Sequence, residues 1–280
     1  MKIINSSVKV IHQTSGLEGM YKHIELCGRI SYKSEDKISE SSYDRFVSNL
    51  IKSGHTSVLE HGTIYMKREV KYSSSDNNKY FDKYEKNPYS EVNYSDGIGY
   101  VTTNFRVLVE NKWTSDLFYL CNPTKFHKQR VTFKFITSIG IVRELLRHRK
   151  FSFTNESTRY CNYSKDKFDN EIVFIAPYWL NDDRQFHHSE SFENAYELFC
   201  SSCEEAERNY MLLLDEGFKP EEAREFLPLC TKSELIMTGF EEDWLQFLNL
   251  RLYNKTGKSH PDMMFLASQI EKEYNVSWKN

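Results

Sequence analysis

The sequence predicts an α+β fold: a mixed or antiparallel sheet with a helical layer and one insertion, in a single domain over residues 1–280. Strand-like and helix-like segments follow one another without regular alternation, which favours α+β over a doubly wound α/β fold. The length allows an ample core, and 39% hydrophobic with 28% charged residues is typical of a globular protein.

The first third of the chain reads as two helices and a strand. Residues 17–32 have the apolar spacing of a helix that runs into a loop. A second helix is predicted within 39–55, with its apolar residues on one side and Gly54 as its stop. Residues 62–72 alternate in the manner of a strand.

Residues 72–130 differ in character from what precedes them. A polar stretch over 73–91 is followed by turn signals at 95–100 and by a strand-like run over 100–110. The apolar runs are too few for a separate core, so we interpret the segment as a surface insertion or lid carried by the main domain.

The second half predicts more helix than strand. Residues 131–149 pass from strand alternation into a helix around 138–149, and a loop follows at 150–170. After it we expect, in order, a strand at 171–177, a long helix at 192–216, a short helix at 221–228, and helices near 241–252 and 261–275.

Charge and hydropathy narrow the classes of protein. The net charge of −3 gives no overall field that would favour nucleic acid or an anionic membrane. The N-terminus has no apolar signal region, and no run reaches the length of a membrane span. We therefore expect a cytoplasmic enzyme or binding protein that does not associate with a membrane.

Neither the six cysteines nor the histidines predict a metal site. Cys200 and Cys203 form a C-x-x-C pair inside the predicted long helix, whereas a zinc or redox pair more usually lies in a turn. A structural role is favoured for this pair, and a redox role stays open. His55 and His61 are six residues apart, which fits no single helix face.

A basic cluster follows the predicted helix at 138–149. Arg143 and Arg147 lie four apart on one helix face, with Glu144 placed to offset part of their repulsion. One interpretation is a solvated helix end whose cations favour the helix dipole. The other is a phosphate or nucleotide site, because arginine forks match phosphate oxygens and the next loop supplies hydroxyl and N–H donors.

Five motifs in order carry a resemblance to a known family. Arg147-His148-Arg149, seven residues and then Ser157 reproduce R-H-R-x7-S, the signature of the flavin-dependent thymidylate synthases. The segments 27–32, 54–61, 222–228 and 247–251 resemble that family's other motifs in the same order. The resemblance covers nearly the whole chain except about 72–130.

The sequence departs from the family pattern at three places. Asn155 and Glu156 stand one position closer to Ser157 than in many members, and Glu144 stands where the family has Gln. Residues 238–246 lack the Asn and Arg that often touch flavin in the family. These departures affect individual contacts more than the overall assignment.

The resemblance implies reductive methylation of dUMP to dTMP. It implies 5,10-methylenetetrahydrofolate as the carbon donor, FAD as the hydride carrier, NADPH as its reductant, and a homotetramer with shared active sites. Every one of these ligands is anionic, which would explain a local excess of arginine in a slightly acidic chain.

The resemblance also implies the site residues. The flavin-binding set is Ser57, His55, Arg147, His148, Arg149 and Glu156. The dUMP-binding set is Glu144, Arg147, Ser157, Thr158, Arg159, Arg224 and Arg251. The catalytic set is Arg251, Arg147 and His148, with Arg251 at the uracil carbonyl. Plainer interpretations remain open: Arg251 could serve a helix end, and Arg224 could simply pair with Glu221 or Glu225.

Two other functions compete with this assignment. A thymidylate synthase with a cysteine nucleophile is disfavoured because no segment reads as its Pro-Cys-His loop. A nucleic-acid-binding module could use the basic 147–159 cluster and the tyrosines of 72–100, but that tyrosine segment is nearly charge-balanced.

Overall fold

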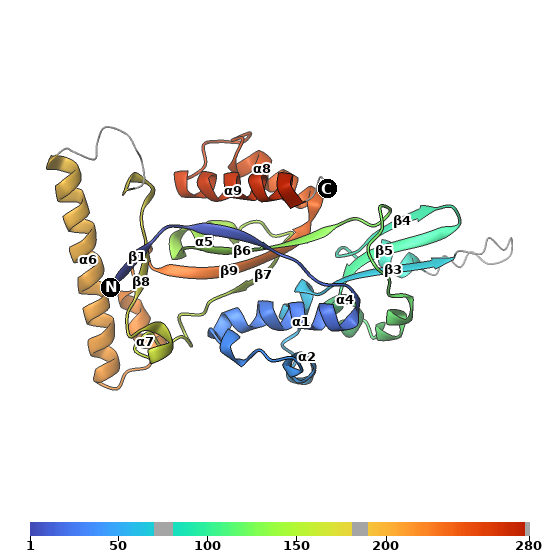
Figure 1. The fold of residues 1–280 in the computed structure, drawn as a ribbon, viewed down its shortest axis with the longest axis horizontal. Coiled ribbons are helices and arrows are strands. Elements are labelled where there is room, and N and C mark those ends of the chain that lie inside the picture. Colours follow the sequence, from blue (N-terminus) through green and yellow to red (C-terminus); the bar gives the residue numbers. More distant parts are fainter. Residues whose placement is uncertain (70–80, 181–189, 278–280) are drawn as a thin grey trace.

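A computed structural model describes residues 1–69, 81–180 and 190–277. Its centre is a four-stranded sheet in the order β2-β6-β9-β7, with every neighbouring pair antiparallel. The strands are β2 (Ser7–Ile11), β6 (Arg130–Ser138), β7 (Ser152–Asn155) and β9 (Lys232–Phe240). Figure 1 shows this sheet between two helical layers.

Alternate residues of β6 face the two layers. Phe133 and Phe135 pack with Trp244 and Phe247 of α8 (Glu241–Arg251) and with α9 (Pro261–Ser277) in one core cluster. On the other face lie α1 (Gly16–Arg29) and α2 (Ser42–Ser53), drawn in blue in Figure 1. The predicted antiparallel α+β architecture with a helical layer is therefore confirmed.

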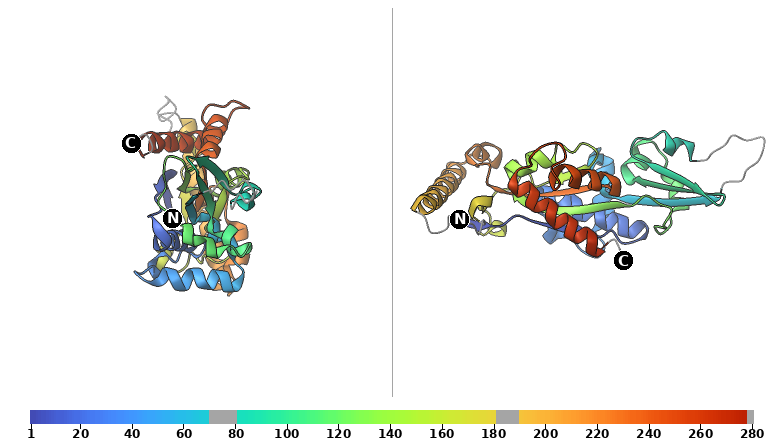
Figure 2. Two further views of the ribbon diagram at one scale, coloured as in Figure 1. Left: turned by 90° about the vertical axis from the view of Figure 1, so that its right-hand side faces the viewer. Right: turned by 90° about the horizontal axis from the view of Figure 1, so that it is seen from above.

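A second sheet extends from one end of the molecule, as Figure 1 and the right view of Figure 2 show. Its order is β3-β5-β4, formed by β3 (Thr63–Glu69), β4 (Glu91–Ser95) and β5 (Ile98–Asn104). The short helices α3 (Asp82–Glu85) and α4 (Phe105–Glu110) accompany it.

The expectation of a surface insertion at 72–130 needs correction for its described part. Residues 81–108 supply the buried side chains of Phe81, Tyr84, Val101 and Phe105, and these join a core cluster with residues of α1, α2 and β3. β5 also pairs along the full length of β3. The segment thus shares a core with the N-terminal helices instead of lying on the surface. The boundary at 72 falls on undescribed residues.

The opposite end holds α6 (Glu190–Asp215), α7 (Pro220–Ala223) and a parallel pair of short strands, β1 (Lys2–Ile4) and β8 (Val173–Ile175). The predicted long helix is confirmed, and Cys200 and Cys203 lie within it as expected. Cys203 packs in a third core cluster with Cys161 and Tyr210. Across the parts of the chain that the structure describes, no helix combines the length and apolar character that a membrane crossing needs.

Other local predictions were wrong or incomplete. Residues 105–110 form α4 instead of continuing a strand, because the Asn104 side chain accepts the Val107 N–H and caps the helix. The helix expected to reach 149 is α5 (Ile139–Leu145) and ends four residues earlier. The loop expected at 150–170 contains β7, and neither β9 nor the N-terminal strands β1 and β2 were predicted.

Candidate functional site

The basic cluster lies in a turn that begins where α5 ends. The His148 N–H donates to the Leu145 carbonyl at 3.1 Å, and the Phe151 N–H donates to the His148 carbonyl at 3.2 Å. The Phe151 ring is buried against Trp244, with ring centroids 4.5 Å apart. Anchored at both ends, the turn exposes Arg147 and Arg149. No hydrogen bond or ion pair joins either guanidinium to another described residue.

The end of α8 meets this turn. Arg251 Nε donates to His148 Nε2 at 2.9 Å, and Arg251 Nη1 lies 3.4 Å from Glu144 Oε2. The sequence-predicted residues Glu144, His148 and Arg251 are thus brought together although more than a hundred positions separate α5 from the end of α8. A guanidinium has five N–H donors, so Arg251 retains donors for a ligand.

The His148 ring is neutral in this arrangement. Burial, and beyond it the charge of Arg251, lowers the pKa of His148 to about 4. Because Nε2 accepts from Arg251, the ring proton is assigned to Nδ1. The ring also packs on Phe247, with centroids 4.8 Å apart. His148 therefore holds Arg251 in place without adding a second positive charge.

A second group of predicted residues gathers near α7. Arg159 Nε donates to Glu221 Oε2 at 2.7 Å, and that hydrogen bond, with the charges of Lys219 and Arg224 behind it, lowers the pKa of Glu221. The Ser157 N–H donates to the Ser31 carbonyl at 3.0 Å, which fixes the loop that carries Ser157 and Thr158. Arg224 itself lies 3.9 Å from Glu225, so the plainer pairing foreseen for it occurs.

The two groups remain separate within one chain. Among residues 1–69, 81–180 and 190–277, no hydrogen bond, ion pair or ring contact joins the Arg251 group to the Arg159 group. His55 and Ser57 are exposed just after α2, and among the described residues neither has a hydrogen bond or ion pair with either group.

Glu156 points into the protein. It is 1% exposed; its Oε1 accepts from the Tyr163 hydroxyl at 3.0 Å, and its Oε2 lies 2.8 Å from Lys232 Nζ. Both carboxylate oxygens are occupied internally. Glu156 thus connects the chain that follows the 157–160 loop, through Tyr163, to the start of β9, through Lys232. Its implied flavin contact stays a prediction.

His61 is buried, and both of its ring nitrogens lie next to threonine hydroxyls. Its Nδ1 lies 2.7 Å from the Thr238 hydroxyl and its Nε2 lies 3.0 Å from the Thr154 hydroxyl. Thr238 continues through Thr132 to His23 in a buried chain of hydrogen bonds. Burial lowers the pKa of His23 to about 4 and that of His61 to about 3. Among the described residues, no cluster of three His, Cys, Asp or Glu side chains could hold a metal ion.

Two adjoining cavities open at the basic turn. One has a volume of about 630 Å³ and the other about 220 Å³, and both are lined by Arg149, Lys150, Phe151 and Asp243. Cationic side chains and aromatic rings that line the same cavities are suited to bind an anionic, aromatic cofactor. The chain's own residues therefore fit a flavin nucleotide at this place.

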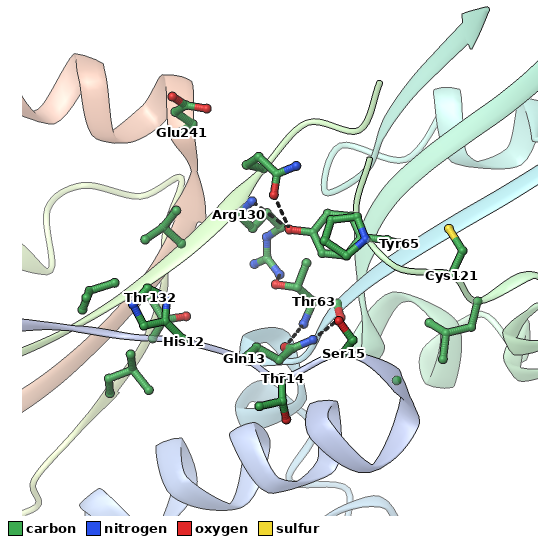
Figure 3. A pocket seen from close by; sticks show the side chains of 17 residues that line it. His12, Gln13, Thr14, Ser15, Thr63, Tyr65, Cys121, Arg130, Thr132 and Glu241 are labelled. Atoms are coloured by element: carbon green, nitrogen blue, oxygen red, sulfur yellow. Dashed lines mark hydrogen bonds between the residues drawn. The ribbon is translucent and has the colours of Figure 1, made fainter. Parts of the chain in front are cut away.

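A third cavity, of about 360 Å³, lies between β2, β3 and β6 (Figure 3). It contains none of the sequence-predicted site residues. Arg130 projects into it beside Thr63 and also lines the 630 Å³ cavity. Its Nη1 donates to the Glu60 carbonyl at 3.1 Å and to Thr63 Oγ1 at 3.2 Å, and burial lowers its pKa to about 10. Sequence reasoning missed Arg130, since a lone arginine at the start of a strand carries no signal.

These features define a class of protein: an α+β protein with an arginine-rich turn beside its central sheet and with Arg251, the last residue of α8, in contact with that turn. The chain belongs to the family described as thymidylate synthase complementing protein, whose model matches residues 89–273. That match also takes in residues 89–130, which the motif resemblance had left out.

Curated relatives agree with this membership. A probable flavin-dependent thymidylate synthase of Paramecium bursaria Chlorella virus 1 is 28% identical over 177 residues, covering 58% of this chain and 77% of that protein. The flavin-dependent thymidylate synthase of Haloarcula marismortui is 32% identical over 114 residues, covering 36% of this chain and 45% of that protein. Among solved structures, a UMP/dUMP methylase from Streptomyces cacaoi aligns with a TM-score of 0.48 and 18% identity, over 99% of this chain and 93% of that one.

Proposed function

We propose that this protein is a flavin-dependent thymidylate synthase that methylates dUMP to dTMP. The observation that carries the proposal is the convergence of Arg251, His148 and Glu144 behind a turn that exposes Arg147 and Arg149. This convergence joins two motifs of the family to which the chain belongs. Relatives named as flavin-dependent thymidylate synthases support the flavin.

Arg251 is the proposed catalytic cation. Two of its contacts are internal, to His148 and Glu144, and they orient the guanidinium. Its remaining donors would bind the uracil carbonyl and stabilise negative charge there as C5 becomes nucleophilic. Because His148 is neutral, that charge stabilisation comes from Arg251 and from the exposed Arg147.

Arg147, His148, Arg149, His55 and Ser57 are the residues proposed to hold FAD. When bound, this cofactor would supply hydride and methylene transfer chemistry, with NADPH as the reductant and 5,10-methylenetetrahydrofolate as the carbon donor. The chain's contribution is to bind, orient and exclude water. Glu156 would act through the loop that it supports.

The phosphate of dUMP is assigned to Ser157, Thr158, Arg159 and Arg224, with Glu144 also on the nucleotide. Arg159 donates to Glu221, and the charge of Arg224 also helps to lower the pKa of that carboxylate, which supports placing both cations at one phosphate site. Since this group does not meet Arg251 within one chain, we propose a homotetramer in which neighbouring chains complete each site. A single domain and a cytoplasmic location complete the proposal.

The test is direct. Purified protein should be yellow, with flavin absorbance, and should convert dUMP to dTMP when given methylenetetrahydrofolate and NADPH. A colourless protein that binds oligonucleotides with strong salt dependence would instead favour the nucleic-acid-binding alternative.

A further inference from the structure

The 630 Å³ cavity has two walls that come from different parts of the sequence. Arg149, Lys150 and Phe151 of the basic turn form one. The other is formed by the segment that we interpreted as a surface insertion, through Pro88, Tyr89, Glu91 and Lys128. The volume falls within the range of about 300–1,000 Å³ that is usual for small-molecule sites.

Hydrogen bonds fix the turn that carries Tyr89, whereas the Tyr89 side chain is exposed. Asn87 Oδ1 accepts the Tyr89 N–H at 2.9 Å and the Ser90 hydroxyl at 3.2 Å. Ser90 Oγ also lies 2.7 Å from Thr103 Oγ1 in β5. The Tyr89 side chain is nevertheless 61% exposed. A large aromatic surface is thus held in the cavity wall by its backbone alone.

The charges around the cavity leave a cation available. Three of its four acids already have basic partners: Glu60 pairs with Arg106, Asp243 with Lys150, and Glu242 with Lys128. Arg149 has no such partner among the described residues. A ligand that combines negative charge with a planar ring matches a cavity lined by both an unpaired guanidinium and an exposed tyrosine.

We propose that Tyr89 forms a wall of the flavin site and stacks on a planar ring of bound FAD, opposite Arg149. This inference rests on the proposed function and extends it to residues 88–128, which the motif resemblance left without a role. Tyr89 is a binding residue in this proposal and takes no part in proton or hydride transfer.

The test is FAD affinity, measured by titrating FAD into flavin-depleted protein and following flavin absorbance or fluorescence. Because stacking on an aromatic side chain contributes to affinity, Tyr89→Ala should weaken FAD binding by about 5- to 150-fold. Tyr89→Phe should keep near-normal affinity, because stacking needs only the ring. The matched control is Phe118→Ala, since Phe118 is an 87% exposed aromatic residue of the same segment that lines none of the three cavities.

The outcomes separate this inference from the proposed function. A wild-type protein that binds no FAD would overturn both. A wild-type protein that binds FAD and makes dTMP, with unchanged affinity in Tyr89→Ala, would overturn only the role of Tyr89. If Tyr89→Ala leaves FAD affinity intact but raises the KM for methylenetetrahydrofolate, the ring contacts the folate and the proposal is wrong as stated.

Discussion

At the scale of single residues, the central feature is an arginine, Arg251, whose guanidinium is oriented by a histidine and a glutamate. Arg251 donates to His148 and lies within reach of Glu144, while the His148 ring is held on Phe247. The sequence motifs identified these residues but could not show that His148 is an acceptor. That role depends on burial, which lowers the His148 pKa to about 4.

Arg251→Ala should therefore have two measurable effects. Loss of a cation at the uracil carbonyl should lower kcat/KM for dUMP by about a hundredfold or more, while FAD stays bound. The pKa of His148 should also rise toward its ordinary value of 6.5, because the charge of Arg251 contributes to lowering it. NMR titration of the His148 ring reports the second effect.

The control for this variant is Arg251→Lys. It keeps a positive charge near His148, so the His148 pKa should stay low, but it lacks the guanidinium fork that uracil recognition needs. Near-normal dTMP formation by Arg251→Ala would remove Arg251 from the site.

Cys161 gives a second prediction at this scale. It is the cysteine closest in sequence to the basic 147–159 cluster. Burial, and to a smaller extent the charge of Glu156, raises the pKa of its thiol to about 11. A thiol is a poor nucleophile under those conditions. Cys161→Ala should keep substantial turnover at saturating dUMP, with any loss appearing mainly in KM. A fall in kcat of about a thousandfold, roughly 4 kcal/mol, with folding and FAD intact would mean that the thiol does chemistry.

At the scale of elements, helices and strands were predicted mainly where apolar residues recur at a regular spacing along the sequence. The helices α1, α2 and α6 and the strand β3 were predicted because their apolar residues recur on one side. α8 and α9 were also predicted, although their apolar residues are spread more evenly around the helix. β9 was missed because seven of its nine residues are buried, so it lacks the alternation that marks a half-exposed strand. The motifs located the basic turn, but Arg130 and Tyr89 join the cavity only through the pairing of remote strands, which leaves no local pattern.

The second sheet yields a prediction about stability. Phe105 is 2% exposed in the core that this sheet shares with α1 and α2, so Phe105→Ala should lower the free energy of unfolding by about 3–5 kcal/mol. Phe118→Ala, in the same segment but 87% exposed, should change it by less than about 0.5 kcal/mol. Urea unfolding measures both. Equal, small effects would restore the interpretation of 72–130 as a surface insertion.

At the scale of the whole molecule, buried histidines make stability depend on pH. His23 and His61 have folded-state pKa values of about 4 and about 3, below the ordinary 6.5. Between about pH 4 and 6.5 the unfolded chain therefore binds more protons than the folded one, and stability rises with pH across this window. Each histidine contributes about 1.4 kcal/mol per pH unit at most.

Unfolding free energies measured in urea at pH 5.0, 5.5, 6.0 and 6.5 check this dependence, because few carboxylates titrate there. Stability should fall steadily as the pH is lowered through these values. A flat profile would mean that both rings carry a proton in the folded protein, and the hydrogen bonds with threonines would then need a different assignment.

The strand order of the central sheet also governs when the protein can fold during its synthesis. β6 (Arg130–Ser138) and β7 (Ser152–Asn155) do not pair with each other, because β9 (Lys232–Phe240) lies between them. β2, the other neighbour of β6, is made first, but at translation rates of about 5–20 residues per second roughly 100 residues must follow β6 before β9 emerges. Until then Phe133 and Phe135 lack β9 on one side and the α8 side chains that bury them. We therefore expect a ribosome-bound chain that stops before residue 240 to expose the apolar face of its future core and to bind chaperones more strongly than the full-length chain does.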